Sequence, residues 1–286
     1  MDQAAGLRRM VSPKPVKVIA VTSGKGGVGK TNLSVNLSIS LSKMGREVML
    51  MDADLGLANV DVLLGLSPKY NLSHVLSGER TLEEIVVDAP GGVKVIPASS
   101  GTQRMAELAP SEHGGVIQAF SELSIPLDYL IIDTAAGISD SVVSFSRAAR
   151  EVIVVVCDEP SSITDAYALI KVLNKDYGVE KFQVISNMVR TAKEGPELFA
   201  KLSRVTEKFL DVPLSYIGAV SFDENVRKAV QKQKPIVETF PGTPASISIK
   251  RIAEKIDKWP LPRAAEGRLE FFVERLIEYS VQAGAF

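Results

Sequence analysis

Cysteine and histidine are scarce in this chain of 286 residues. It has one cysteine, Cys157, and two histidines, His74 and His113, which lie far apart in the sequence. A single cysteine cannot form an intramolecular disulfide, and such usage is typical of a reducing cytoplasm. Structural zinc sites and iron–sulfur clusters each need several cysteine or histidine ligands, so neither is expected.

Long apolar runs and an excess of charge are also absent. The longest apolar run, residues 152–157, is far shorter than the ~18 residues of a membrane-spanning helix. The N-terminus lacks the apolar core of a secretory signal. Lysine and arginine number 33 against 34 acidic residues, which gives a net charge of −1. The chain has no basic excess of the kind that would indicate direct binding to nucleic acid. We therefore expect a globular cytoplasmic protein that does not bind nucleic acid directly.

A glycine-rich loop between a predicted strand and a predicted helix organises the chain. Residues 18–23 are rich in β-branched side chains, as in a buried strand, and residues 32–37 have helical spacing. Between them, residues 24–31 match G-x-x-x-x-G-K-[ST] in full. Glycines let backbone N–H groups face a phosphate, and the helix directs its positive dipole end there. This motif predicts a phosphate-binding loop for a nucleotide, with Lys30 on the β- and γ-phosphates and the Thr31 hydroxyl on Mg²⁺. The nucleotide-binding residues expected here are Gly24, Lys25, Gly26, Gly27, Val28, Gly29, Lys30, Thr31 and Asn32.

Aspartates follow two further predicted strands. Residues 47–51 lead to Asp52 and Asp54, and residues 127–132 lead to Asp133, which is a Walker B pattern. Parallel sheets bind ligands at the carboxyl ends of their strands, so these carboxylates should face the phosphates. We expect Asp133 to hold Mg²⁺ through water and Asp52 to lie in the outer shell of the same ion.

Lys25 directly follows the first glycine and gives the segment K-G-G-V-G-K-T. This is the deviant Walker A motif, and with residues 54–61, which fit D-x-G-L-x-N-x-D, the chain resembles the MinD/ParA-type ATPases over nearly its whole length. The resemblance implies a doubly wound α/β domain with a mostly parallel sheet and helices on both faces. It also implies a homodimer that forms around two ATP molecules and is reset by hydrolysis. In such a dimer Lys25 would cross to the partner's nucleotide, Lys30 would hold the phosphates, and Asp54 would position the attacking water.

Four more positions match the family pattern, in segments that follow predicted strands. By resemblance, Gly137 of switch II would offer its N–H to the γ-phosphate and Glu159 would lie near the partner's ribose. Asn187 would read adenine, since an amide can both donate and accept, and Asp223 would lie beside the base. Glu159 and Asn187 each have a structural alternative, because acids complement helix starts and amides favour turns. Ala135 replaces a proline common in relatives, which leaves the coupling of switch II in question.

Residues 1–14 are predicted to be a flexible segment that ends in a proline-containing linker. Residues 2–8 match D-Q-A-x-x-L-R, which resembles the N-terminal activator motif of the FlhG/FleN flagellar-number regulators, a branch of the MinD-like ATPases. In that branch the segment contacts the FlhF-type GTPase, so Gln3, Leu7 and Arg8 are expected to bind this partner. A disordered tail is the alternative.

The same resemblance implies control of flagellar number, placement and gene expression, with a FleQ-type transcriptional regulator as a further partner. A septum-site MinD-type membrane ATPase and a ParA-type partition ATPase are the rival functions.

Residues 263–286 are predicted to form an amphipathic helix after the ATPase domain of residues 15–262. Its apolar face would comprise Leu269, Phe272, Val273, Leu276, Ile277 and Ser280. Its polar face carries four acids against two arginines: Glu266, Glu270, Glu274 and Glu278 against Arg268 and Arg275. Anionic lipid would repel that charge. We therefore expect weak or no membrane binding and docking on protein, with transient visits to the membrane or cell pole as the alternative.

Overall fold

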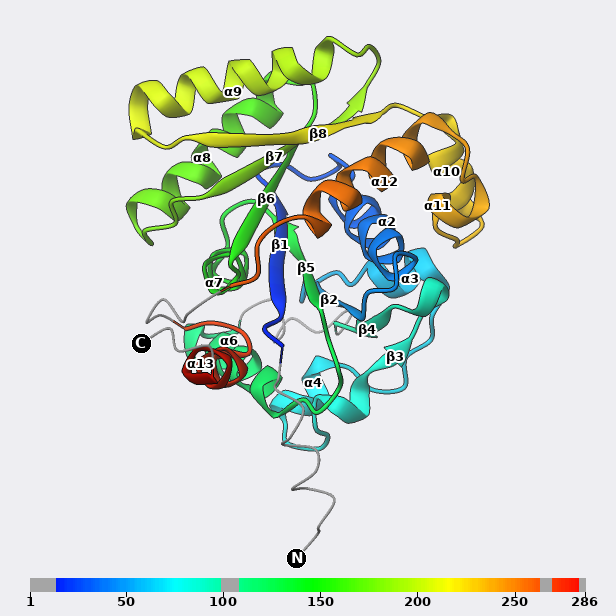
Figure 1. Cartoon of the computed structure of the whole chain (residues 1–286), viewed down its shortest axis with the longest axis vertical. Coiled ribbons are helices and arrows are strands. Elements are labelled where there is room, and N and C mark those ends of the chain that lie inside the picture. Colours follow the sequence, from blue (N-terminus) through cyan, green and yellow to red (C-terminus); the bar gives the residue numbers. More distant parts are fainter. Residues whose placement is uncertain (1–13, 99–107, 263–268, 283–286) are drawn as a thin grey trace, which may run out of the picture.

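The computed structural model describes residues 14–98, 108–262 and 269–282 (Figure 1). The strands are β1 (Lys17–Ser23), β2 (Val48–Ala53), β3 (Val87–Asp88), β4 (Lys94–Ile96), β5 (Tyr129–Ala136), β6 (Glu151–Val156), β7 (Phe182–Val189) and β8 (Leu214–Ser221). The α-helices are α2 (Lys30–Ser42), α3 (Val60–Leu64), α4 (Leu72–Leu76), α6 (Pro110–Ala119), α7 (Asp140–Ala148), α8 (Pro160–Lys175), α9 (Glu194–Leu210), α10 (Glu224–Gln231), α11 (Ile236–Thr239), α12 (Pro244–Asp257) and α13 (Val273–Gln282). Short 3-10 helices are η1 (Glu83–Ile85), η2 (Pro90–Gly92) and η3 (Phe120–Glu122).

The eight strands form one sheet in the order β3-β4-β2-β5-β1-β6-β7-β8. Every neighbouring pair is parallel except β3 and β4, which the sequence did not predict as a pair. The strands that carry the phosphate loop and the Walker B aspartate, β1 and β5, lie side by side in the middle of the sheet. Strands covered on both faces read as nearly continuous apolar runs, which is why these segments were visible in the sequence.

Helices cover both faces of the sheet (Figure 1). Ile19 and Val21 of β1 point to a core shared with α2, α11 and α12. Val18 and Ala20 point to the opposite core, shared with α6 and α7, and a third core joins β6 and β7 to α8 and α9. Alternate residues of one strand therefore fill different layers, as strand geometry requires. The predicted doubly wound, mostly parallel α/β fold is confirmed.

Helix α13 packs on the body of the protein. The rings of Phe271 and Phe272 lie 5.0 and 5.6 Å from the ring of Phe120, both edge to face. Leu276 is buried in the same region, and the Arg275 guanidinium donates to the Leu123 carbonyl. Within the described residues, the segment therefore lies against protein as expected.

The composition of that helix's two faces was partly mispredicted. Leu269 and Ile277 remain 47% and 44% exposed, whereas Glu270 is only 4% exposed and lies 3.9 Å from Arg150. The helix begins at Val273; residues 271–272 before it form a turn, and residues 269–270 belong to no regular element. The predicted helical spacing does not hold through these irregular residues. Leu269 is therefore exposed and Glu270 buried, the reverse of the prediction. Glu266 and Arg268 lie outside the described residues.

Candidate nucleotide-binding site

The glycine-rich loop spans the end of β1 and the start of α2 and lines a cavity of about 750 Å³. Gly27 and Gly29 have φ angles of +82° and +84°, which side chains with a Cβ seldom adopt. The loop's contribution to the cavity is Lys25, Gly26, Gly27, Val28, Gly29, Lys30, Thr31 and Asn32, and Asp54 and Asn59 lie across from them. Backbone N–H groups at a helix start, in a cavity of this size, can bind phosphate.

Gly24 does not line this cavity and serves the packing of the loop instead. A Cβ at Gly24 would lie 2.1 Å from the carbonyl carbon and 2.2 Å from the carbonyl oxygen of Asp165, in the first turns of α8. The backbone of the loop can approach α8 this closely only without a side chain.

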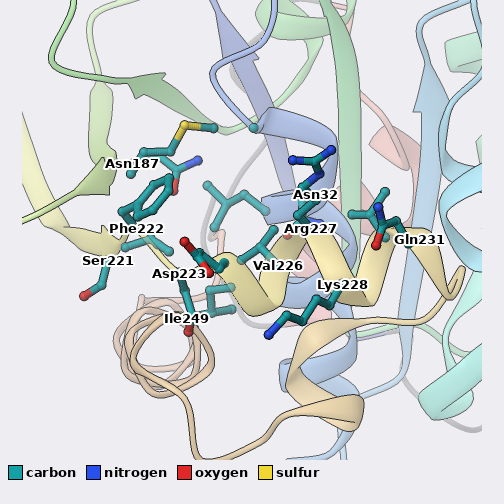
Figure 2. A pocket seen from close by; sticks show the side chains of 16 residues that line it. Asn32, Asn187, Ser221, Phe222, Asp223, Val226, Arg227, Lys228, Gln231 and Ile249 are labelled. Atoms are coloured by element: carbon teal, nitrogen blue, oxygen red, sulfur yellow. The ribbon is translucent and has the colours of Figure 1, made fainter.

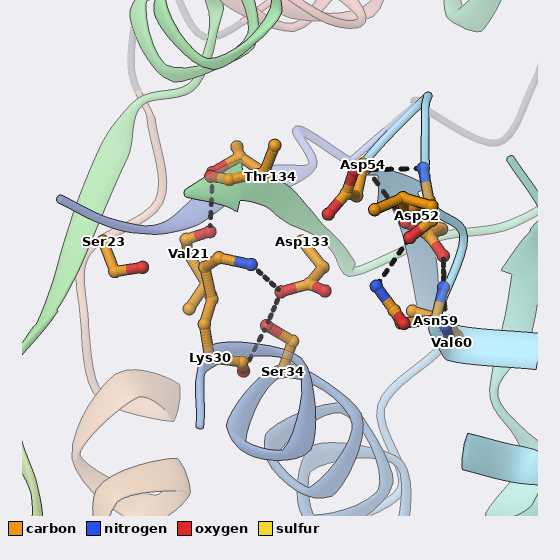
Figure 3. Close-up of polar contacts among 12 residues, drawn as sticks. Val21, Ser23, Lys30, Ser34, Asp52, Asp54, Asn59, Val60, Asp133 and Thr134 are labelled. Carbon is orange, nitrogen blue, oxygen red and sulfur yellow. Dashed lines mark hydrogen bonds and ion pairs between the residues drawn. The ribbon is translucent and has the colours of Figure 1, made fainter. Parts of the chain in front are cut away.

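The buried Walker B carboxylate contacts the P-loop lysine (Figure 3). Asp133 has no exposed surface; its Oδ1 accepts a 2.8 Å hydrogen bond from the Ser34 hydroxyl and lies 3.5 Å from Lys30 Nζ. Its Oδ2 is also buried and has no hydrogen-bond partner among the described residues. Buried polar atoms are nearly always satisfied, so this oxygen indicates a place for a water or ligand.

Asp52 lies directly beside Asp133 in the β2–β5 register and holds the following loop. Its carboxylate accepts backbone N–H groups from Asp54 at 3.1 Å, Asn59 at 2.9 Å and Val60 at 3.0 Å. Burial, and then the neighbouring Asp133, raise the pKa of Asp52 to about 7. Asp54 lines the cavity itself, and burial raises the pKa of its carboxyl. The loop of residues 54–60 is thus tied to a carboxylate at the phosphate site.

The donor set fits magnesium. In the parts of the chain that the structure describes, no group of three or more histidine, cysteine or acidic side chains forms a protein-only metal cage. Mg²⁺ is usually held by one or two carboxylates, waters and substrate phosphates. Thr31 at the cavity, Asp133 with its unpaired oxygen, and Asp52 beside it match that description.

Two predicted phosphate contacts are engaged elsewhere in this protomer. Lys25 Nζ donates to a carboxylate oxygen of Glu159 and to Ser161 Oγ at 2.8 Å, and its hydrogen bond to Glu159 raises the pKa of Lys25. The Gly137 N–H donates to the Ser23 carbonyl at 2.9 Å. The Lys25 ammonium must leave Glu159 and Ser161 before it can reach a phosphate. The Gly137 N–H must likewise leave the Ser23 carbonyl.

A second cavity of about 800 Å³ (Figure 2) adjoins the first, and Gly29 and Asn32 are among the residues that line both. Asn187 is at its wall, but its amide donates to the Val28 carbonyl at 2.7 Å and so supports the loop. Asp223 lies there too and caps α10 by accepting the Asn225 N–H at 2.9 Å. The predicted base-side residues therefore reach the cavity while also having structural roles.

Met188 and Phe222 line this second cavity as well, and no sequence pattern singles them out. The available signal was their position, since each is adjacent to a predicted site residue just after a predicted strand. The predicted partner-binding residues Gln3, Leu7 and Arg8 lie outside the described residues.

A family model described as "ParA: NUBPL iron-transfer P-loop NTPase" matches residues 14–257. The chain belongs to the ParA/MinD family of P-loop ATPases. Among curated relatives of this family, the antiactivator FleN of Pseudomonas aeruginosa is 58% identical over 98% of this chain and 100% of its own length. The flagellum site-determining protein YlxH of Helicobacter pylori is 37% identical over 92% of this chain and 90% of its own length.

Solved structures give the same family. The septum site-determining protein MinD of Pyrococcus horikoshii, complexed with Mg-ADP, matches with a TM-score of 0.70 and 28% identity over 85% of this chain and 96% of that chain. The predicted ParA/MinD-type fold and ATPase class are confirmed. The iron transfer named in the family model's description refers to NUBPL and is not assigned to this chain. Within the described residues, no helix is long and apolar enough to cross a membrane.

Proposed function

We propose that this protein is an ATP-driven dimer switch that regulates flagellar number, flagellar placement and flagellar gene expression through partner proteins. The observation that carries this proposal is the 58% identity, over nearly the full chain, to an antiactivator named FleN. The relative named for flagellum site determination supports it. The phosphate cavity supplies a site for the nucleotide that such a switch requires.

The loop and the buried aspartates bind different parts of the nucleotide complex: the loop binds the phosphates, and the aspartates serve the metal ion. Backbone N–H groups of residues 25–31 bind the phosphates, and Lys30 neutralises the β- and γ-phosphates from its place beside Asp133. Thr31 would be the direct ligand of Mg²⁺, and Asp133 and Asp52 would help to hold the ion at this site. When bound, the ion would supply positive charge that offsets the negative charge developing during phosphoryl transfer.

Hydrolysis depends on the residues that face the γ-phosphate. Asp54, held at the cavity by the loop that Asp52 ties down, orients the attacking water. Lys25 leaves Glu159 when a second protomer docks, and it then neutralises the partner's phosphates across the interface. Glu159, once released, turns to the partner's ribose. Gly137 exchanges its Ser23 contact for the γ-phosphate, so its position reports hydrolysis. Asn187 and Asp223 lie on the base side.

The regulatory output passes through other proteins. The N-terminal segment would bind an FlhF-type GTPase through Gln3, Leu7 and Arg8, ordering itself as it binds. A FleQ-type transcriptional regulator would be the second partner, in keeping with the name antiactivator of the 58% identical relative. The docked position of α13 favours weak or no membrane binding. The proposal places the protein in the cytoplasm, with partners bringing it transiently to the membrane or cell pole.

Complementation in the flagellated host tests this function. Deletion of the gene should give cells with an altered number or position of flagella, counted by electron microscopy. Wild-type protein should restore the count, and Lys30→Gln, which lacks the phosphate-binding ammonium, should not. Normal flagella in the deletion strain would refute the proposal.

A separate assay tests the partner contact. A peptide of residues 1–14 should raise GTP turnover by the host's FlhF-type GTPase, and Gln3→Ala in the peptide should abolish the effect. If neither the peptide nor the intact protein alters turnover, the segment has no such partner.

A further inference from the structure

A small cavity lies at the end of the sheet opposite the phosphate loop. It has a volume of about 200 Å³ and lies where β1, β6 and β7 begin, beside the chain that leaves α12 (Figure 1). Strand β1 has seven residues, each adding about 3.3 Å, so roughly 20 Å separate this cavity from the phosphate loop. Among the described residues, it shares no lining residue with the two cavities of the nucleotide site. It is therefore a separate site.

Positive charge predominates at this cavity. Three cations line it, Lys17, Arg150 and Lys181. Among the described lining residues, Glu151 is the one acid, and its carboxylate accepts a hydrogen bond of 3.2 Å from Gln183 Nε2. The whole chain has a net charge of −1, so this excess is local. Cations gathered around a small space of this kind attract an anion.

Three of the lining side chains bring hydrogen-bond donors that the rest of the described structure leaves unused. Lys17 Nζ donates to the Tyr129 hydroxyl at 3.2 Å and to the Asp257 carbonyl at 3.0 Å, which leaves one of its three N–H groups. Among the described residues, neither the Lys181 ammonium nor the Trp259 indole N–H has an acceptor. Burial lowers the pKa of Lys17, so an anion beside it would stabilise its charged form. The cavity thus offers donors to a ligand that accepts.

The remaining wall of the cavity is apolar. Its residues are Trp259, Pro260, Leu261 and Pro262. Sites for small molecules combine such surface with a few placed polar groups, and those for drug-sized ligands start at about 300 Å³. This cavity is smaller, so it fits an anion with only a short carbon skeleton.

We propose that this cavity binds a small phosphate monoester. A phosphate group carries up to two negative charges and three acceptor oxygens, which matches the unused donors of Lys17, Lys181 and Trp259. A carboxylate has one charge and two oxygens, and so matches them less well. The two ammonium groups supply most of the charge, because Arg150 already lies 3.9 Å from Glu270. The short carbon portion of the ester covers the apolar wall. This inference does not rest on the proposed function.

Titration of the full chain, without nucleotide, tests the site. Trp259 is the only tryptophan in the sequence, so its fluorescence reports on this cavity. Glycerol 3-phosphate should change that fluorescence saturably, and it should bind more tightly than inorganic phosphate or succinate. Lys181→Ala should weaken glycerol 3-phosphate by about tenfold, the lower end for a hydrogen bond to a charged group, because Lys181 is exposed.

Two matched variants separate this site from other sources of binding. Lys193→Ala removes the same charge from an exposed position at the start of α9, and it should leave the affinity unchanged. Lys30→Gln disables the phosphate loop and should also leave it unchanged. Calorimetry on Lys30→Gln measures the same binding without relying on fluorescence.

Four results would overturn the inference. They are no heat of binding in Lys30→Gln, wild-type affinity in Lys181→Ala, equal loss of affinity in Lys193→Ala, and equal affinity for glycerol 3-phosphate and succinate or inorganic phosphate. The first would assign any binding by the wild type to the phosphate loop. None of these results bears on ATP binding, so the proposed function is tested separately.

Discussion

Replacing Gly24 by alanine should destabilise the protein without any nucleotide present. The new Cβ would lie 2.1 Å from the Asp165 carbonyl carbon, so loop and helix must separate by more than 1 Å to restore ordinary contact. The obstacle is the backbone of α8, which is anchored by the fully buried Ala166 and Leu169. Overpacking of this kind typically costs about 1–3 kcal/mol. Because backbone atoms cannot rotate away as a side chain can, we expect the free energy of unfolding to fall by an amount near the upper end of that range, about 2–3 kcal/mol.

Urea unfolding followed by circular dichroism measures that loss. At roughly 2 °C per kcal/mol for a chain of this size, the melting temperature should fall by about 4–6 °C. Gly26→Ala is the matched control, because a Cβ there meets nothing within 4 Å. Its free energy of unfolding should stay within about 0.5 kcal/mol of the wild type. Equal stabilities of the two variants would refute the role of Gly24 in packing against α8.

Three further predictions concern chemistry, assembly and pH. Asp54→Ala should bind ATP normally but release phosphate roughly 10²- to 10⁴-fold more slowly; wild-type turnover would remove Asp54 from catalysis. Lys25→Ala should lose more hydrolysis than ATP affinity, and the wild type should sediment as a dimer with a non-hydrolysable ATP analogue and as a monomer with ADP. One mass in both states would refute the dimer. The hydrogen bond from Arg46 lowers the pKa of Asp257 below 3.8, so the stability it contributes is present above that pH and lost as pH falls through the lowered value. Asp257→Asn should therefore be less stable than the wild type at pH 7, and the gap should narrow below pH 3.8; a gap that stays constant would contradict this.

The chemistry of the site was readable because it depends on short, contiguous patterns. The segment from Gly24 to Thr31 supplies its own phosphate-binding N–H groups, lysine and hydroxyl, and a strand before it and a helix after it suffice to orient them. The carboxylates of Asp52 and Asp133 each follow an apolar run, and parallel strands deliver such residues to one edge of the sheet. Burial of the strands on both faces made those runs conspicuous.

The two termini were harder to predict, for different reasons. The match at residues 2–8 is short, and these residues lie outside the described part of the chain. For the C-terminal helix, periodicity identified an amphipathic element, but the irregular backbone of residues 269–272 broke the spacing. Glu270 consequently lies buried beside Arg150 instead of in solvent, a pairing of residues 120 positions apart that no local pattern reveals.

The sequence by itself determined the phosphate loop and the aspartates that face it, because local spacing and strand burial dictate these features, and its resemblance to the MinD/ParA-type ATPases added the doubly wound fold. Only the tertiary structure decided what each residue does beyond the motif. The backbone of Gly24 packs against Asp165 of α8, the Asn187 amide supports the loop through the Val28 carbonyl, and Met188 and Phe222 line one cavity. Each of these roles depends on contact with a different element of the fold. Residue type and spacing alone do not encode such contacts.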